Sequence, residues 1–289
     1  STSGVYELGS VFKTFTLAAG LQQNVIQEDT LFKNLPKKIK CAGRSISEYD
    51  MDIPSSLTAE EILIRSGNIG SIKIAQKVGL ENFKDFLENL DLLNKIQFDI
   101  EEVGNPIPFK WGKCKLATSA YGHGITTTPL QLAKAYAIIT NGGYKIKPTL
   151  IKKEKNIKRG EQIITQENSN KVTEILRKIV TSEQGTANLA NIAGYEIAGK
   201  TGTAQKSIKG KYSKKKINTF ASIFPISSPK YVLIVLLDEP KLSETYIYEY
   251  NDGKKRKIIG TPFNTAGWTS VEVAKNIIEK IGPILAIKY

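Results

Sequence analysis

The sequence predicts an α+β fold, in which a helical middle is followed by an antiparallel sheet and a closing helix. Three observations support this prediction. Apolar residues recur at a helical spacing as far as Val180, extended apolar runs follow between Tyr195 and Leu237, and a helical pattern returns from Val271 to Ile281. Short connections between the extended runs favour antiparallel strands.

Two capping boxes mark the helical part of the chain. Thr58 and Glu61 have the spacing of this motif. Thr128 and Gln131 repeat it, and Pro129 between them suits the first helical turn. Helices are expected near Ser10–Leu21, Ala59–Ile64, Ile69–Val78, Phe83–Leu90, Pro129–Thr140 and Val172–Val180.

Three strands are expected in the last third, at Tyr195–Gln205, Thr219–Ile226 and Lys230–Leu237. A Lys-rich loop joins the first two strands, and a Ser-Ser-Pro turn joins the last two. The Lys- and Pro-rich segment after Leu21 is expected to be a loop, and so are residues 99–112.

The bulk composition is that of an ordinary globular protein. The chain has 289 residues, of which 40% are hydrophobic, and needs neither disulfides nor metals to form a core. Its longest purely aliphatic run, Val232 to Leu237, is far shorter than the roughly 20 residues that span a bilayer. No segment resembles a signal peptide and the first residue is Ser1, so a processed chain or a fragment is expected.

The net charge of +13 admits two interpretations. One is a polyanionic partner, such as nucleic acid, anionic lipid heads or phosphorylated glycan precursors. The favoured one is scattered surface lysine, because the basic residues are interspersed with Glu and Asp and no nucleic-acid-binding signature accompanies them. A solvated loop is likewise favoured over an anion-binding one for Lys206, Lys209, Lys211, Lys214, Lys215 and Lys216.

The cysteines and the single histidine give no metal site. Cys41 and Cys114 are far apart, and His123 has no His or Cys cluster around it, which excludes a His/Cys zinc site. Both cysteines are interpreted as small buried residues, with a disulfide between them as the alternative. His123 is interpreted as structural or as part of the rim of a site. No metal or cofactor is expected.

Three short motifs carry the chemistry. They are Ser10-Val11-Phe12-Lys13, Ser66-Gly67-Asn68 and Lys200-Thr201-Gly202. Each is weak alone, but their order and their placement on a helix start, a loop between helices and a strand are typical of serine acyl-transfer enzymes.

The residue types suit that chemistry. Ser10 needs a base, and Lys13 lies one helical turn away on the same face. Burial and a second cation, Lys200, would lower the pKa of Lys13 and leave it neutral. Ser66 can relay a proton to a leaving amine, and the Asn68 amide can bind a substrate carbonyl.

The tetrahedral oxyanion that forms during acyl transfer needs two N–H donors. The backbone N–H groups of Ser10, at a helix start, and Thr203, on a strand, are the candidates. Gly202 would leave room for an extended substrate peptide beside the strand.

Longer segments resemble one family. Tyr6–Phe15 resembles the nucleophile segment of class B penicillin-binding proteins, with Leu8 where Pro is usual. Tyr121–Ala133 resembles their mid-domain segment, and Gly185–Ala187 with Ala198–Lys206 their active-site strand. The chain thus resembles the transpeptidase domain of this family, most closely its septal, cell-division type.

The resemblance implies a fold, a site and partners. The fold is the penicillin-binding and β-lactamase type, an antiparallel sheet flanked by helices with a helical lobe. The substrate is a peptidoglycan stem peptide ending in D-Ala-D-Ala, on lipid-linked precursor or nascent glycan, and β-lactams acylate the same serine. A periplasmic location, an inner-membrane anchor outside this chain, and divisome partners including a glycosyltransferase are implied, without nucleic acid. The implied roles are nucleophile for Ser10, base for Lys13, proton transfer and substrate binding for Ser66 and Asn68, electrostatics for Lys200, and carboxylate binding for Thr201 and Thr203.

Other acceptors and roles stay open. A D,D-carboxypeptidase or a β-lactamase shares the acylation step but uses water, for which Glu101 and Asn105 have a spacing reminiscent of class A β-lactamases. From another class, the chain could be a non-catalytic β-lactam sensor or a divisome scaffold.

The chain departs from the family pattern at its start. The family places the first strands of the sheet before the S-x-x-K motif, but only nine residues precede Ser10. Residues 1–289 are therefore expected to be one N-terminally truncated catalytic domain, whose incomplete sheet would make the isolated chain unstable or aggregation-prone.

Overall fold

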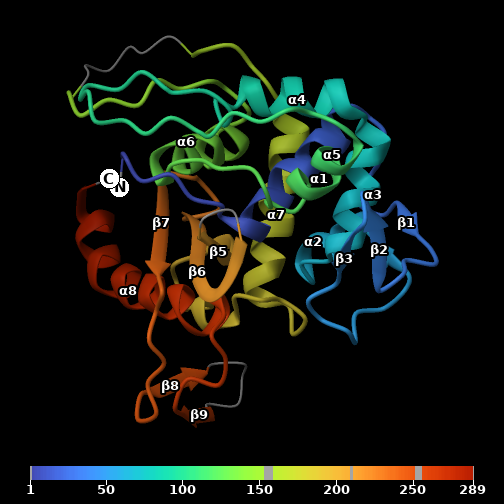
Figure 1. Cartoon of the computed structure of the whole chain (residues 1–289). Coiled ribbons are helices and arrows are strands. Elements are labelled where there is room, and N and C mark those ends of the chain that lie inside the picture. The colour runs from blue at the N-terminus through green and yellow to red at the C-terminus, as the bar shows by residue number, and fades with distance from the viewer. Residues whose placement is uncertain (1, 153–158, 209–210, 251–255, 289) are drawn as a thin grey trace.

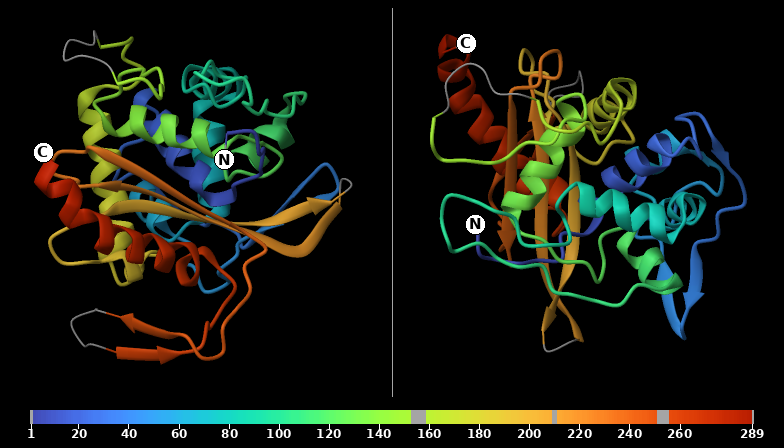
Figure 2. Two further views of the ribbon diagram at one scale, coloured as in Figure 1. Left: turned by 90° about the vertical axis from the view of Figure 1, so that its left-hand side faces the viewer. Right: turned by 90° about the horizontal axis from the view of Figure 1, so that it is seen from above.

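The computed structural model describes residues 2–152, 159–208, 211–250 and 256–288. A three-stranded antiparallel sheet in the order β5–β6–β7 lies between helices (Figure 1). Helix α8 covers one face of the sheet, and α6 lies on the other, beside a lobe of helices (Figure 2). This is the predicted α+β arrangement of a helical lobe, an antiparallel sheet and a closing helix.

The elements run as follows along the chain. The helices are η1 (Gly9–Phe12), α1 (Lys13–Gln22), α2 (Ala59–Ile64), α3 (Asn68–Val78), α4 (Leu80–Asn89), α5 (Lys113–Ser119), α6 (Pro129–Thr140), α7 (Gln166–Thr181), η2 (Asn188–Ala190), η3 (Ala266–Trp268) and α8 (Ser270–Lys288). The strands are β1 (Leu31–Phe32), β2 (Lys38–Cys41), β3 (Arg44–Ser47), β4 (Leu57–Thr58), β5 (Ala198–Ile208), β6 (Lys211–Phe224), β7 (Tyr231–Asp238), β8 (Ile247–Tyr250) and β9 (Arg256–Ile259).

Both predicted capping boxes form. The hydroxyl of Thr58 accepts from the Glu61 N–H while the Glu61 carboxylate accepts from the Thr58 N–H, which starts α2. The same reciprocal pair joins Thr128 and Gln131 at α6, with Pro129 at its first position. These local bonds satisfy N–H groups that have no partner inside the helix, so the helix starts follow directly from the sequence.

The predicted loops proved more structured than expected. Hairpin β2–β3 lies in the Lys- and Pro-rich segment after α1, and β1 pairs with β4 around it. Helix α5 and hairpin β8–β9 were also missed. Strands β5 and β6 extend through most of the supposed Lys-rich loop, to Ile208 and from Lys211, and Lys209 lies outside the described residues.

Helix α1 lies at the centre of the core. Every residue from Lys13 to Leu21 is buried, which explains why this helix has no polar face. Phe15 packs edge-on against Phe12 and Tyr136, with ring centroids 5.5 and 5.4 Å apart. The Tyr136 hydroxyl donates to the Val11 carbonyl at 2.9 Å, so α6 holds the start of α1 in place.

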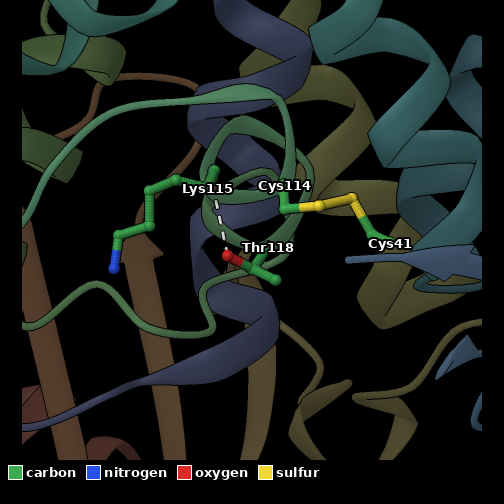
Figure 3. The surroundings of a disulfide bond; sticks show 4 residues. All are labelled: Cys41, Cys114, Lys115 and Thr118. Atoms are coloured by element: carbon green, nitrogen blue, oxygen red, sulfur yellow. Dashed lines mark hydrogen bonds between the residues drawn. A yellow bond between two sulfur atoms is a disulfide. The ribbon is translucent and has the colours of Figure 1, made fainter. Parts of the chain in front are cut away.

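The interpretation of the cysteines as small buried residues was wrong. Cys41, at the tip of hairpin β2–β3, forms a disulfide with Cys114 in α5, and their Cα atoms are 5.6 Å apart (Figure 3). The sequence separation of 73 residues carried no signal for the pairing, because the hairpin that presents Cys41 was not predicted. The disulfide ties this hairpin to the helical lobe.

The sequence analysis predicted a sheet that lacks its first strands and therefore has an exposed edge. In the described part of the chain the sheet ends at β7, which has helices α6 and α8 over its faces. Whether the isolated chain is unstable stays a prediction. No described helix is long and apolar enough to cross a membrane.

Candidate active site

The three motifs meet at one serine hydroxyl. Lys200, on β5, donates from Nζ to the Ser66 Oγ at 2.9 Å, and Lys13, at the start of α1, donates to the same oxygen at 3.2 Å. Lys13 also donates to the Ser66 carbonyl. Elements separated by more than a hundred residues therefore place two amines around one hydroxyl.

Ser10 lies where the chain turns into this helix. It is half-buried in the short helix η1, directly before α1, and it borders a groove of about 920 Å³. Gly9 has φ +62°, and a side chain at Gly122 would meet the Gly9 carbonyl at 1.9 Å. Both glycines are thus required for the predicted mid-domain segment to close around the nucleophile.

Ser66 occupies a strained position. Its φ is +59°, and the N–H groups of Ser66 and Gly67 donate to the carbonyls of Leu63 and Ile62. This is a Schellman motif that ends α2, with Ser66 at the left-handed position where glycine is usual. A side chain there costs about 1–2 kcal/mol, and in this strained conformation the Ser66 hydroxyl reaches both lysines.

The two lysines have depressed pKa values. Both are fully buried, and loss of hydration lowers the pKa of Lys13 to about 7. Burial, and then the nearby charge of Lys13, hold the pKa of Lys200 well below its usual range. The sequence predicted this lowering for Lys13 and named burial and a second cation as its causes. Burial lowers the pKa of Lys13 as predicted, but the second cation is not among the causes. The repulsion between the two lysines instead lowers the pKa of Lys200.

Asn68 is more constrained than the sequence suggested. Its side-chain nitrogen donates to the Ser47 carbonyl at 2.8 Å, which uses one of the two N–H groups of this amide. The buried Glu48 carboxylate accepts from the backbone N–H groups of Asn68 and Ile69 at 2.6 and 2.8 Å. Sequence reasoning missed Glu48, because its position depends on the unpredicted hairpin β2–β3.

The threonines of the third motif line the groove. Thr203 Oγ1 accepts from the Ala266 N–H at 2.9 Å, so its own hydrogen is free to donate. Thr201 Oγ1 lies 2.6 Å from Thr186 Oγ1, a partner that sequence reasoning did not identify. A side chain at Gly202 would meet the Leu8 carbonyl at 2.4 Å. Close packing against Leu8 therefore also requires glycine here, in addition to the predicted room for a substrate peptide.

His123 packs in the wall of the groove. Its ring lies 4.6 Å from that of Tyr121 and 5.9 Å from that of Tyr212. Burial lowers its pKa, which favours the neutral imidazole. The nearby Glu7 carboxylate accepts from the Gly124 N–H and the Tyr212 hydroxyl, both at 3.0 Å, and so fastens the nucleophile segment. These contacts agree with a structural or rim role for the histidine.

Glu101 lies elsewhere. It borders a separate shallow depression together with Asp99 and Lys147, and it does not line the groove that holds Ser10. The interpretation that Glu101 activates a hydrolytic water therefore has no support from its position.

The fold and the site define a class of arrangement: two buried lysines bonded to the Ser66 hydroxyl, in a groove that Ser10 and strand β5 also line. The family model "Penicillin binding protein transpeptidase domain" matches residues 1–264. The chain belongs to this family, as the sequence motifs predicted.

Relatives and solved structures agree with this membership. The chain is 30% identical to "Probable peptidoglycan D,D-transpeptidase FtsI" of Caulobacter vibrioides, covering 100% of this chain and 48% of that protein. It is 28% identical to "Probable peptidoglycan D,D-transpeptidase PenA" of Neisseria flavescens, covering 85% of this chain and 61% of the relative. The chain thus spans about half the length of these relatives.

Solved structures share the fold. The transpeptidase domain of Burkholderia pseudomallei penicillin-binding protein 3 superposes with a TM-score of 0.81 at 24% identity, covering 97% of this chain and 81% of the other. Mycobacterium tuberculosis penicillin-binding protein 3 complexed with aztreonam gives a TM-score of 0.79 at 24% identity, covering 97% and 64%. The predicted penicillin-binding fold is confirmed.

Proposed function

We propose that this chain is a serine D,D-transpeptidase domain that cross-links peptidoglycan stem peptides through a Ser10 acyl-enzyme in septal wall synthesis. The observation that carries the proposal is that the amines of Lys13 and Lys200 both donate to the Ser66 hydroxyl, in a groove that Ser10 also lines. The names of the relatives support the reaction class.

The acylation step follows from this geometry. The Ser10 Oγ attacks the carbonyl carbon of the penultimate D-Ala, and neutral Lys13 takes its proton. The backbone N–H groups of Ser10 and Thr203 stabilise the oxyanion. Ser66, held between the two amines, passes its proton to the departing D-Ala nitrogen as the peptide bond breaks, and takes the proton that Lys13 received from Ser10. An amine from a second stem peptide then attacks the ester and releases Ser10.

The substrate lies along the edge of the sheet. In this proposal the peptide adds to β5 as an extended strand, next to Gly202. The Thr201 and Thr203 hydroxyls bind its terminal carboxylate, for which Thr203 has a free hydrogen. The remaining Asn68 N–H binds a backbone carbonyl. β-Lactams take the same place and acylate Ser10.

The cellular setting follows from the resemblance. We propose that residues 1–289 form one catalytic domain of a longer protein, with sheet strands that precede this chain. The domain faces the bacterial periplasm from an inner-membrane anchor. It acts on lipid-linked precursor beside a glycosyltransferase and other divisome proteins.

The test is intact-mass spectrometry after incubation with benzylpenicillin, with Ser10→Ala as the control. A persistent adduct on the wild-type chain, absent from the control, is expected. Drug destroyed without an adduct would point to a β-lactamase. An intact drug without an adduct would contradict acylation and favour a scaffold. A D-Ala-D-Ala peptide offered with an acceptor amine separates transfer from the carboxypeptidase reaction, because water as the only acceptor gives no cross-linked product.

A further inference from the structure

Glu48 is a buried acidic residue outside the three motifs that contacts the Ser66–Asn68 loop. The residue is only 7% exposed. One carboxylate oxygen accepts from the Asn68 N–H at 2.6 Å and the other from the Ile69 N–H at 2.8 Å. These are the first N–H groups of α3, which have no partner inside the helix, so the carboxylate fixes the end of the motif loop.

The backbone around Glu48 is itself held. Its N–H donates to the Lys37 carbonyl at 2.9 Å, which extends the pairing of hairpin β2–β3 by one residue. The preceding carbonyl, of Ser47, accepts from the Asn68 side chain. The far end of the hairpin is tied to α5 by the disulfide of Cys41. Hairpin β2–β3 is thus held at both ends, and it fixes the position of the Glu48 carboxylate next to the Ser66–Asn68 loop.

Glu48 also acts on the lysine pair through its charge. The carboxylate raises the pKa of Lys13 and so opposes the lowering that burial causes. His123 also faces this pair, since Lys13 lowers its pKa and Glu7 raises it. Arg65, directly after α2, and Asp50, before α2, pair with each other in the wall of the same groove. Within this set Glu48 is the carboxylate that is buried.

We propose that Glu48 is a positioning residue for acylation: it fixes the Ser66–Asn68 loop against α3 and partly balances the positive charge of the Lys13–Lys200 pair. It acts through those residues, because both of its carboxylate oxygens accept from backbone N–H groups of the loop and of α3. This inference rests on the proposed acyl-transfer function.

The test measures the benzylpenicillin acylation rate of the wild-type chain, Glu48→Gln and Glu48→Asp between pH 5.5 and 9. In Glu48→Gln an amide NH₂ faces a backbone N–H and the charge is lost. We expect the maximal rate to fall about 10- to 100-fold. The midpoint of the acid limb should move down by on the order of one pH unit, because lysine loses an attractive charge. Glu48→Asp keeps the charge, so its midpoint should match wild type while its maximal rate falls.

The matched control is Glu60→Gln, which removes one negative charge from α2, where Glu60 pairs with Lys178 at 2.8 Å. It should leave both rate and midpoint unchanged. A Glu48→Gln rate equal to wild type would overturn the inference, and so would a fall of equal size at every pH with an unmoved midpoint. If Glu48→Gln does not fold by circular dichroism, an unchanged maximal rate in Glu48→Asp would overturn it. A wild-type chain without an adduct would instead remove the proposed function itself.

Discussion

Lysines lie in two contrasting regions of this molecule: inside, around Ser66, and at the outer end of the β5–β6 hairpin. Inside, Lys13 and Lys200 are fully buried, and burial lowers the pKa of each. Outside, Lys206 bonds to Asp238 and Glu239 at 2.9 Å, and these bonds raise its pKa. The residue type is the same, so the environment alone decides whether a lysine can act as a base.

The outer lysines are also less available to a partner than the net charge suggested. Lys206 and Lys215 share Glu239, and Lys216 donates to the Asn264 carbonyl. Contacts within the protein thus partly neutralise their charge. This agrees with the interpretation of these lysines as a solvated surface and not as an anion-binding site.

The largest effect is expected from breaking the inner region. Lys13→Met removes the proposed base, and we expect the rate of acylation by benzylpenicillin to fall about 10²- to 10⁴-fold. The measurement is adduct formation over time by intact mass. A fall of less than threefold would show that Lys13 is not the base.

The next largest effect is expected from the disulfide that ties hairpin β2–β3, in the wall of the groove, to α5. Replacing both Cys41 and Cys114 by Ser removes a link between residues 73 positions apart. We expect the free energy of unfolding to fall by about 2–4 kcal/mol, measured by urea denaturation. The single variants Cys41→Ser and Cys114→Ser should each lose as much. An unchanged denaturation midpoint in the double variant would mean that packing alone holds the hairpin.

A smaller effect is expected in the difference in stability between two variants of Ser66. Ser66→Gly and Ser66→Ala both lose the hydroxyl and should both lose acylation. Only glycine relieves the left-handed backbone at φ +59°. Ser66→Gly should therefore be more stable than Ser66→Ala by about 1 kcal/mol. Equal stabilities would contradict the strain assigned to this position.

The smallest effect belongs to the outer region. Lys206→Met breaks exposed ion pairs, which contribute little to stability. We expect the acylation rate and the thermal midpoint to stay at wild-type values within error. A tenfold slower acylation would show that the hairpin end serves the active site directly.

Local signals explain what the sequence could predict. The capping boxes at Thr58 and Thr128 set helix starts through bonds within four residues, and the central sheet follows from strand patterns with short turns. The three motifs predicted which residues meet at the site. Glu48 could not be predicted and the disulfide was only an alternative, because both depend on the hairpin β2–β3, whose own pattern is weak. The segment Gly185–Ala187 was matched to the active-site strand, but the contact of Thr186 with Thr201 depends on long-range packing.

The most direct test of the account is the acylation rate of the wild-type chain with benzylpenicillin as a function of pH. Protonated Lys13 cannot accept the Ser10 proton, and its pKa lies at about 7. The rate should therefore rise with pH through a midpoint near 7 and level off above it. A rate that rises only above pH 9, as for an ordinary exposed lysine, or one that is flat from pH 6 to 9, would contradict a buried, neutral lysine as the base.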